Sequence, residues 1–259
     1  MNSPFKSIVA AGSVAILVAA CGSMPSSRPA AQMAQQDLTT LGVAEAAAMI
    51  RERKITSEAL TRALIAKANA GKSLNAFITL DEAAAIKAAQ EADAMTAAGK
   101  SRGALHGVPI AIKDNIEVAG MPSTAGTPAL KSFIPKQNAP VAQKLVDAGA
   151  IMFGKTNMHE LAFGITTANA AFGTTGNPYD PKRFAGGSSG GSAAVVAARM
   201  APGSLGADTG GSMRIPPAVC GIVGLRPTLG RYPGGGVAPI SYTFDTTGPM
   251  ARSVSDVAM

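Results

Sequence analysis

The chain has 259 residues, of which 47% are apolar and 15% charged, and it contains 29 glycines and 17 prolines. This composition supplies enough apolar side chains for one large folded domain and excludes a disordered tail. The formal net charge is +7, but Lys and Arg are scattered along the chain instead of forming a basic stripe, so nucleic-acid binding is not favoured.

The first residues predict an export signal. Lys6 precedes an apolar run over residues 8–20 that is too short to span a bilayer comfortably, and small residues lead to Cys21. The segment VAAC resembles a bacterial lipobox, which implies cleavage before Cys21 and a diacylglycerol on its sulfur; an ordinary buried thiol is the alternative. After processing, Cys220 would have no intrachain partner, which excludes a disulfide framework and a cysteine-ligated zinc site. The expected divisions are a signal peptide with lipobox over 1–21, a flexible tether over 22–37 and the folded domain over 38–259.

Apolar periodicity and cap residues predict the elements of the first half. Thr56 is placed as the N-cap of a helix, and Gly99 and Gly149 as helix stops. Helices are expected over residues 43–53, 57–70, 81–98 and 139–148, and strands over 74–80, 107–113 and 151–154. Because strands alternate with helices, the fold class is α/β, in layers. From Thr166 onward Gly, Ser, Asn and Pro dominate, and one helix is expected there, over 192–201.

Two short motifs match functional patterns that their context does not support. The spacing of GAIMFGKT, residues 149–156, fits a phosphate-binding P-loop, but AIMF is apolar and suits a buried strand better than an open turn. The segment GGSSG, residues 186–190, fits the nucleophile elbow of α/β-hydrolases. That fold supplies its histidine after the serine, whereas His106 and His159 both precede it. Both histidines are therefore expected to be structural.

Lys113 is the obvious base for a serine nucleophile in this chain. A serine hydroxyl is a poor nucleophile at neutral pH and needs an adjacent base. Lys113 ends the apolar strand segment VPIAIK, so its amine is expected to be buried. Desolvation can lower the pKa of a fully buried lysine by roughly three to five units, which would leave the amine partly neutral near pH 7.

A resemblance to a known family rests on one long motif and four flanking segments. The long motif is GGSSGGSAAVVAARMAPGSLGADTGGSMRIPPAVCG, residues 186–221, and the flanking segments are ALHGVPIAIKDN, GKTNMHELAFG, GNPYDP and DTTGPMARSV. From Leu38 to the C-terminus, the chain resembles the amidase signature family of serine-lysine amidases. This family includes bacterial amidases, fatty acid amide hydrolase and the amidotransferase subunit that releases ammonia from glutamine. The resemblance implies an α/β amidase-signature fold, a mixed central β-sheet covered by helices on both faces, here incomplete at the C-terminus.

The resemblance also implies a catalytic role for three residues, which fall in three separately recognisable stretches of these segments. Ser212 would be the attacking serine, Ser188 the bridging serine after a cis peptide bond, and Lys113 the base. Ser188 would pass the proton of Ser212 to Lys113 and then return it to the departing amine. Amide cleavage needs this return, because the amine must leave protonated.

Further residues around the nucleophile are assigned by the same resemblance. Glycines let backbone N–H groups converge on one point, which suits an oxyanion hole. The hole is expected at the N–H groups of Thr209, Gly210, Gly211 and Ser212. Ser189 and Asp208 resemble a supporting hydrogen-bonding pair, and Arg214 resembles a structural arginine beside the nucleophile.

These assignments predict hydrolysis of a carboxylic acid amide to the acid and ammonia or an amine, by a Ser-cisSer-Lys mechanism through an acyl-enzyme, with no cofactor and no metal. The expected partners are a small-molecule amide, a membrane reached through the lipid anchor and, as one option, a second copy in a homodimer, but no nucleic acid. The protein is expected to be exported and anchored on the periplasmic side of a bacterial membrane. Two alternatives stay open: an inactive truncated fragment, and an amidotransferase A-type subunit, against which the export signal argues.

Overall fold

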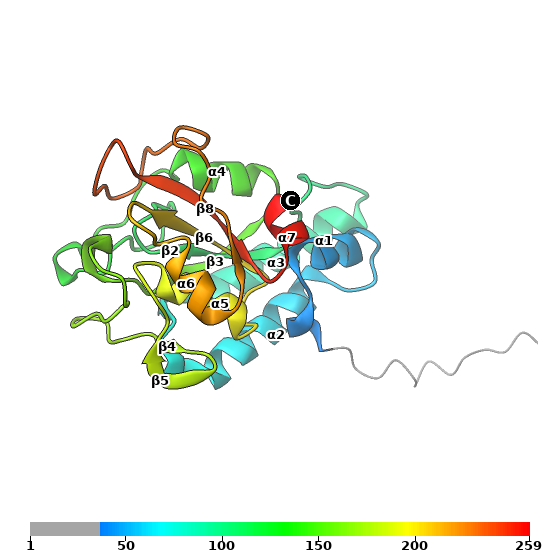
Figure 1. Cartoon of the computed structure of the whole chain (residues 1–259). Coiled ribbons are helices and arrows are strands. Elements are labelled where there is room, and N and C mark those ends of the chain that lie inside the picture. The colour runs from blue at the N-terminus through cyan, green and yellow to red at the C-terminus, as the bar shows by residue number, and fades with distance from the viewer. Residues whose placement is uncertain (1–36) are drawn as a thin grey trace, which may run out of the picture. The chain divides into compact units, whose positions relative to one another are not determined.

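A mixed six-stranded β-sheet forms the centre of the computed structural model, which describes residues 37–259 (Figure 1). The predicted signal peptide, its lipidation residue Cys21 and nearly all of the predicted tether lie outside the described residues. The sheet has the order β1-β3-β2-β6-β8-β7. Its strands are β1 (Phe77–Thr79), β2 (Pro109–Lys113), β3 (Ile151–Thr156), β6 (Gly203–Asp208), β7 (Val223–Gly224) and β8 (Thr246–Ala251). Strand β2 runs parallel to both β3 and β6, and the other pairings are antiparallel.

Helices cover both faces of this sheet. They are α1 (Val43–Arg51), α2 (Ser57–Ala70), α3 (Glu82–Ala97), α4 (Pro140–Asp147), α5 (Gly190–Ala197), α6 (Ile215–Cys220) and α7 (Val254–Ala258). Short 3-10 turns span Leu38–Thr40, Lys72–Leu74, Pro128–Leu130 and Glu160–Ala162, and a separate hairpin joins β4 (Gly176–Asn177) to β5 (Asp180–Phe184). Helix α5 packs on the face to which Lys113 points, and α4 on the other, where Val141 lines the same groove as Ile110.

Most predicted elements of the first half are confirmed, and the α/β fold class with them. Thr56 caps α2 as expected, since its hydroxyl accepts the Ala59 amide at 3.0 Å. The segment 151–156 is a buried strand and not a phosphate-binding turn. Three predictions for the second half are wrong. Helix α5 begins at Gly190 and ends at Ala197, and it is not the one helix of this half, because α6 and α7 follow it. The strands β6 and β8 occupy sequence that was expected to be irregular.

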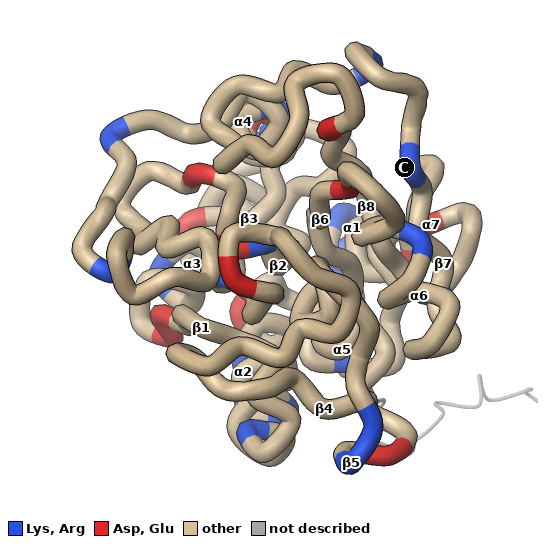
Figure 2. Tube along the Cα trace, turned by 60° about the vertical axis from the view of Figure 1, so that its left-hand side comes forward, with Lys and Arg blue, Asp and Glu red and all other residues tan. Residues whose placement is uncertain are grey.

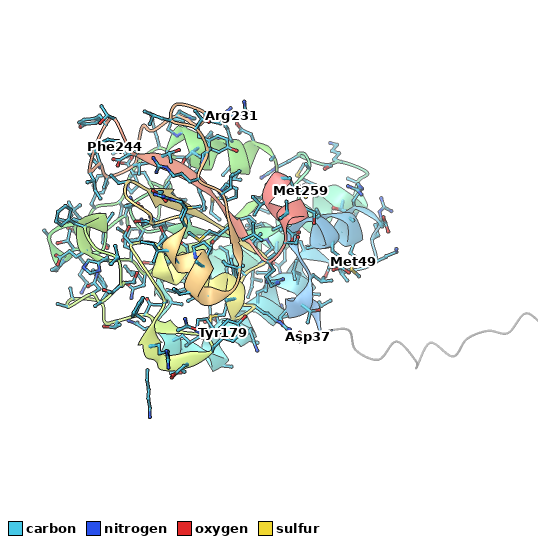
Figure 3. All side chains as sticks on the ribbon, in the orientation of Figure 1. Asp37, Met49, Tyr179, Arg231, Phe244 and Met259 are labelled. Carbon is cyan, nitrogen blue, oxygen red and sulfur yellow. The ribbon has the colours of Figure 1, made fainter. Side chains whose placement is uncertain are left out.

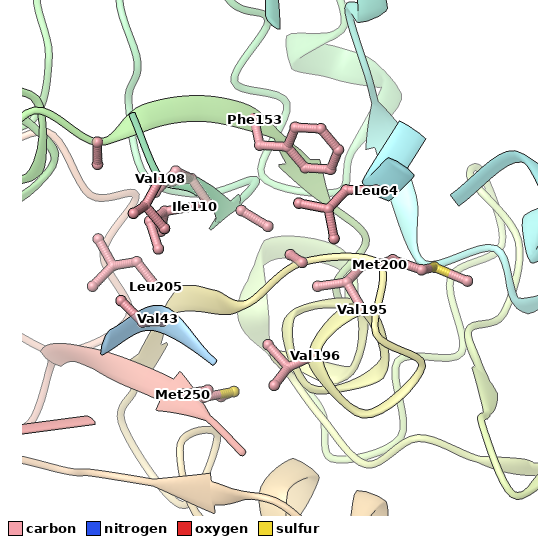
Figure 4. Packing of buried hydrophobic residues seen from close by; sticks show 14 of the residues in the cluster. Val43, Leu64, Val108, Ile110, Phe153, Val195, Val196, Met200, Leu205 and Met250 are labelled. Atoms are coloured by element: carbon pink, nitrogen blue, oxygen red, sulfur yellow. The ribbon is translucent and has the colours of Figure 1, made fainter. Parts of the chain in front are cut away.

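Helix α5 lies at the centre of the apolar core. Residues 193–196 have no exposed surface. Figure 4 shows Val195 in one packed cluster with Leu64 of α2, Phe153 of β3 and Met200. Full burial of a side chain of this size contributes about 1.5–3 kcal/mol relative to leaving it in water, so the core fixes α5 on the sheet. Ser188 and Ser189, which directly precede α5, are thereby held at one place on that sheet face.

Charged residues are spread over the surface of the described domain. Figure 2 shows Lys and Arg interspersed with Asp and Glu along the trace, without a stripe of one sign. Within residues 37–259, no helix combines the length and apolarity needed to cross a membrane. The same residues contain no group of three or more His, Cys, Asp or Glu side chains arranged to hold a metal ion.

Candidate active site

Three polar side chains from different segments of the chain form one hydrogen-bonded line. Lys113 is the last residue of β2, Ser188 directly precedes the first turn of α5, and Ser212 follows β6. Lys113 Nζ lies 2.7 Å from Ser188 Oγ, which lies 2.9 Å from Ser212 Oγ. The Gly187–Ser188 peptide bond is cis. Lys113 and Ser188 are completely buried, and Ser212 keeps 8% of its surface exposed, so the line runs from the interior outward.

Burial gives Lys113 the properties of a base. It lowers the pKa of the amine to about 7, against the opposing negative charges of Asp208 and Asp245, which raise it. Within residues 37–259, the amine has one further hydrogen-bond partner besides Ser188, the carbonyl of Ala207 at 3.3 Å. A neutral amine can accept a proton from Ser188, and a hydroxyl can both donate and accept. The two contacts can therefore carry a proton from Ser212 to Lys113 and back.

Asp208, the last residue of β6, organises the turn that carries Ser212. Its two oxygens accept the amides of Gly211 at 2.9 Å and of Met213 at 2.8 Å. Arg214 binds the carboxylate through two nitrogens, at 3.1 and 3.2 Å, and Arg226 Nη1 lies 2.6 Å from Oδ1. Burial acts to raise the pKa of Asp208, but Arg214, the two amides and Arg226 together hold it below its usual value. The ionised carboxylate of Asp208 therefore holds the turn that carries Ser212.

The four amides predicted to form the oxyanion hole differ in their hydrogen-bond partners. The amides of Thr209, Gly210 and Ser212 donate to no acceptor within residues 37–259, so they are available to an oxyanion. The amide of Gly211 is not available, because it already donates to Asp208. Three of the four predicted donors therefore remain.

Ser189 does not pair directly with Asp208 as predicted. Its hydroxyl donates to the carbonyl of Ala207 at 3.1 Å, which is the carbonyl that Lys113 also reaches. A carbonyl oxygen has two lone pairs and can accept both bonds. Ser189 therefore supports the main chain of β6 beside the lysine. Arg214 lies two residues after Ser212 and forms an ion pair with Asp208.

The remaining reactive side chains are not part of the line. His106 Nε2 lies 3.1 Å from the carbonyl of Ala92, and His159 approaches the site only with its backbone amide, which donates to the Ser188 carbonyl at 3.1 Å. Burial raises the pKa of the Cys220 thiol to about 12, so this cysteine is inert near neutral pH.

A cavity of about 250 Å³ opens beside the hydrogen-bonded line. Lys113, Ser188 and Thr209 contribute to its lining, and Ser212 lies one hydrogen bond from Ser188. Residues 237–240, Val-Ala-Pro-Ile, form an apolar part of the wall. An apolar cavity with a few convergent polar groups is the usual form of a small-molecule site.

Sequence reasoning did not assign two charged residues that the structure places at this site. Arg226 binds Asp208, and Asp245 lines the cavity and accepts a hydrogen bond from Thr209. Asp245 opens the segment DTTGPMARSV, which carries part of the family resemblance, so a signal was present without a role attached to it. Nothing in the sequence around Arg226 points to Asp208.

Comparisons with known proteins show what this chain is similar to. Residues 59–259 match the family model described as Amidase. The chain is 51% identical over 229 residues to mandelamide hydrolase of Pseudomonas putida, covering 86% of this chain and 45% of that protein. It is 48% identical over 223 residues to the A-type subunit of glutamyl-tRNA(Gln) amidotransferase from Acidothermus cellulolyticus, covering 86% and 44%. Among solved structures, peptide amidase from Stenotrophomonas maltophilia superposes with a TM-score of 0.80 at 41% identity, covering 84% of this chain and 46% of that one. The chain thus spans less than half the length of these relatives.

Proposed function

The chain belongs to the amidase family, and from this premise we propose that the protein hydrolyses a carboxylic acid amide to the acid and ammonia or an amine. The observation that supports the proposal most directly is the hydrogen-bonded line from Lys113 through Ser188 to Ser212, with a lysine pKa of about 7. Such a line supplies both a base for the nucleophile and an acid for the leaving group, which amide cleavage requires.

The proposed reaction has two halves. Ser212 Oγ attacks the amide carbon while its proton moves to Ser188 and the proton of Ser188 moves to Lys113. The oxyanion that forms is held by the free amides of the turn. The same path then returns a proton to the nitrogen as the C–N bond breaks, leaving an ester on Ser212. In the second half water adds to this acyl-enzyme, its proton follows the same route, and the acid is released.

Hydrolysis of a panel of aliphatic and aryl amides by the purified protein tests the proposal. Ser212→Ala and Lys113→Ala are expected to lose turnover. Ser204→Ala is a matched control, because Ser204 is also a buried serine but donates to the carbonyl of Ser192, away from the line. Undiminished turnover in both Ser212→Ala and Lys113→Ala would eliminate the mechanism, and a parent protein that cleaves no amide would favour an inactive fragment.

An amidotransferase A-type subunit is the second candidate, because one such protein is 48% identical to this chain. The same panel separates the two candidates when glutamine is included as an amide. Ammonia release from glutamine alone would favour the second candidate. Cleavage of other amides, with glutamine left intact, would favour the first.

We also propose that the protein is exported and lipid-anchored through Cys21, on the basis of the sequence before that residue. Expression in a bacterium with an alkyne-labelled fatty acid tests this. Label is expected on the parent protein and on Cys220→Ser, the matched control at the second of the two cysteines, and is expected to disappear in Cys21→Ser. Equal label in Cys21→Ser would rule out this anchor.

A further inference from the structure

The carboxylate of Asp245 connects two segments that are separate in the sequence. Asp245 directly precedes β8 and contributes to the cavity lining. Its Oδ1 accepts the hydroxyl of Thr209 at 2.5 Å. Its Oδ2 accepts the backbone amides of Ile240 at 2.8 Å and Ser241 at 2.9 Å. Each oxygen therefore serves a different segment, and a side chain with a single acceptor oxygen could not replace the carboxylate.

The two connected segments are the ones a substrate would meet. Thr209 begins the turn that ends at Ser212, and its amide is one of the free donors of that turn. Ile240 belongs to the apolar wall of the cavity. The bond from the Thr209 hydroxyl to Asp245 fixes the side-chain rotamer of Thr209 and anchors the start of the turn, next to that amide. The carboxylate thus sets the turn and the wall in one geometry.

Arg226 reinforces this connection from the other side. Its Nη1 donates to the carbonyl of Asp208 at 2.7 Å, and its Nη2 donates to the carbonyl of Phe244 at 2.8 Å. Figure 3 shows Phe244 on the outer side of the molecule, in the segment that leads into β8. Phe244 is 60% exposed, so its main chain and not its ring anchors this segment. The two connections therefore lie next to each other: Arg226 links Asp208 to Phe244, and Asp245 links the following residue, Thr209, to the cavity wall.

We infer that Asp245 is a positioning residue for the amidase reaction, which holds the oxyanion turn and the substrate-facing wall in register through Thr209 and the amides of Ile240 and Ser241. The inference rests on the proposed function. Asp245 does not touch the reacting atoms and is not a base, because three donors already occupy its oxygens.

Asp245 also acts on the catalytic lysine through its charge, which distinguishes it from a purely structural link. Two carboxylates, Asp208 and Asp245, raise the pKa of Lys113. Asp208 is neutralised by Arg214 and Arg226, whereas no Lys, Arg or His within residues 37–259 forms an ion pair with Asp245. Removing the Asp245 charge therefore lets the pKa of Lys113 fall further.

Two variants separate the hydrogen bond from the charge. Thr209→Val removes the hydroxyl and keeps the carboxylate. Asp245→Asn keeps the shape and removes the charge, and it presents an NH₂ group to one of the two donor segments. The readout is the rate at which a fluorophosphonate labels Ser212, measured against pH by mass spectrometry, together with kcat and KM on an amide of the panel. Labelling requires the turn and the proton line but no amide turnover. Asp180→Asn, at an exposed ion pair on β5, is the control.

Both variants are expected to label about tenfold to a hundredfold more slowly, which is part of the ~10²–10³ that the loss of one oxyanion donor costs. Only Asp245→Asn is expected to move the acid limb of the labelling profile to lower pH, and the control should match the parent. Labelling within twofold of the parent in both variants would overturn the inference, as would an unshifted acid limb in Asp245→Asn. A parent that is labelled but cleaves no amide would defeat the proposed function alone. A parent that is not labelled would defeat both.

Discussion

At the scale of single residues, the site depends on a lysine that is buried where its charged form is disfavoured. Lys113 has no exposed surface, and no carboxylate within residues 37–259 forms an ion pair with it. In such a place the charged form loses its hydration without a partner, so the neutral amine becomes competitive near pH 7. The two hydroxyls next to it then form a proton path instead of an ion pair.

This burial predicts the pH dependence of catalysis. In the proposed mechanism the base is the neutral amine of Lys113, whose pKa is about 7, so kcat/KM is expected to rise through pH 7, to level off above about pH 8 and to fall tenfold per pH unit below pH 6. Initial rates on a cleaved amide from pH 5 to pH 9 measure the profile. Thermal unfolding over the same range is the control for loss of fold. A profile that stays flat to pH 5 would show that Lys113 is not the titrating base.

At this scale, the role of a residue can be predicted from sequence when a short motif carries it. The roles of Lys113, Ser188 and Ser212 are carried by short motifs, and the structure brings these residues together. Which backbone amides of the turn are free depends on the main-chain conformation, and the sequence does not reveal that Asp208 already binds the Gly211 amide. The bridge formed by Asp245 joins residues that lie 36 positions apart, so only the fold discloses it.

At the scale of elements, α5 is held at a fixed distance from the sheet by a glycine. A Cβ on Gly191 would lie 2.3 Å from the carbonyl oxygen of Asn157 and 2.6 Å from that of Ala76. Both contacts are with backbone, which cannot move aside as a flexible side chain can. The start of α5 therefore rests directly on the end of β3, and Ser188 is placed by this contact.

Gly191→Ala is expected to push α5 outward, to lower the melting temperature by several degrees and to reduce kcat by at least about tenfold as the contact between Ser188 and Ser212 opens. Overpacking of this kind costs typically 1–3 kcal/mol. Gly234→Ala is the matched control for stability, because its Cβ would meet nothing within 4 Å; Gly234 lines the cavity, so the rates are compared with those of the parent protein. Differential scanning calorimetry and steady-state rates measure the two effects. A Gly191→Ala protein as stable as the control would contradict this account of the packing.

The difference between local sequence signals and tertiary packing explains which elements could be predicted from the sequence. Helices of the first half carry an apolar face and cap residues such as Thr56, and both are local signals. Strand β6, with the sequence GSLGAD, lacks alternation because it is buried on both faces, and its glycines signal a turn. A Cβ on Gly206 would meet Met213 and Met250, so this glycine serves close packing between layers. Tertiary packing determines that this segment is a strand, and its local sequence propensity does not indicate one.

At the scale of the whole molecule, the fold is less stable near neutral pH because it buries lysines. In the folded chain the pKa of Lys113 is about 7 and that of Lys155 about 8, both lowered mainly by burial, against 10.5 for an ordinary lysine. Between these values the unfolded chain binds protons that the folded chain does not. Stability therefore rises with pH from about 7 towards 10.5 as far as these two groups are concerned.

Lys113→Met isolates the contribution of Lys113 to this pH dependence of stability. The cost of keeping Lys113 buried falls by about 2 kcal/mol between pH 7 and pH 9, so the parent should gain that much stability over the interval relative to Lys113→Met. Urea unfolding of both proteins at the two pH values measures the difference. Contributions shared by both proteins, such as those of Lys155 and Cys220, cancel in the comparison. An equal pH dependence of the free energy of unfolding in the two proteins would mean that the fold does not hold the Lys113 amine neutral. The stability lost by burying this lysine would then have no link to the proposed base.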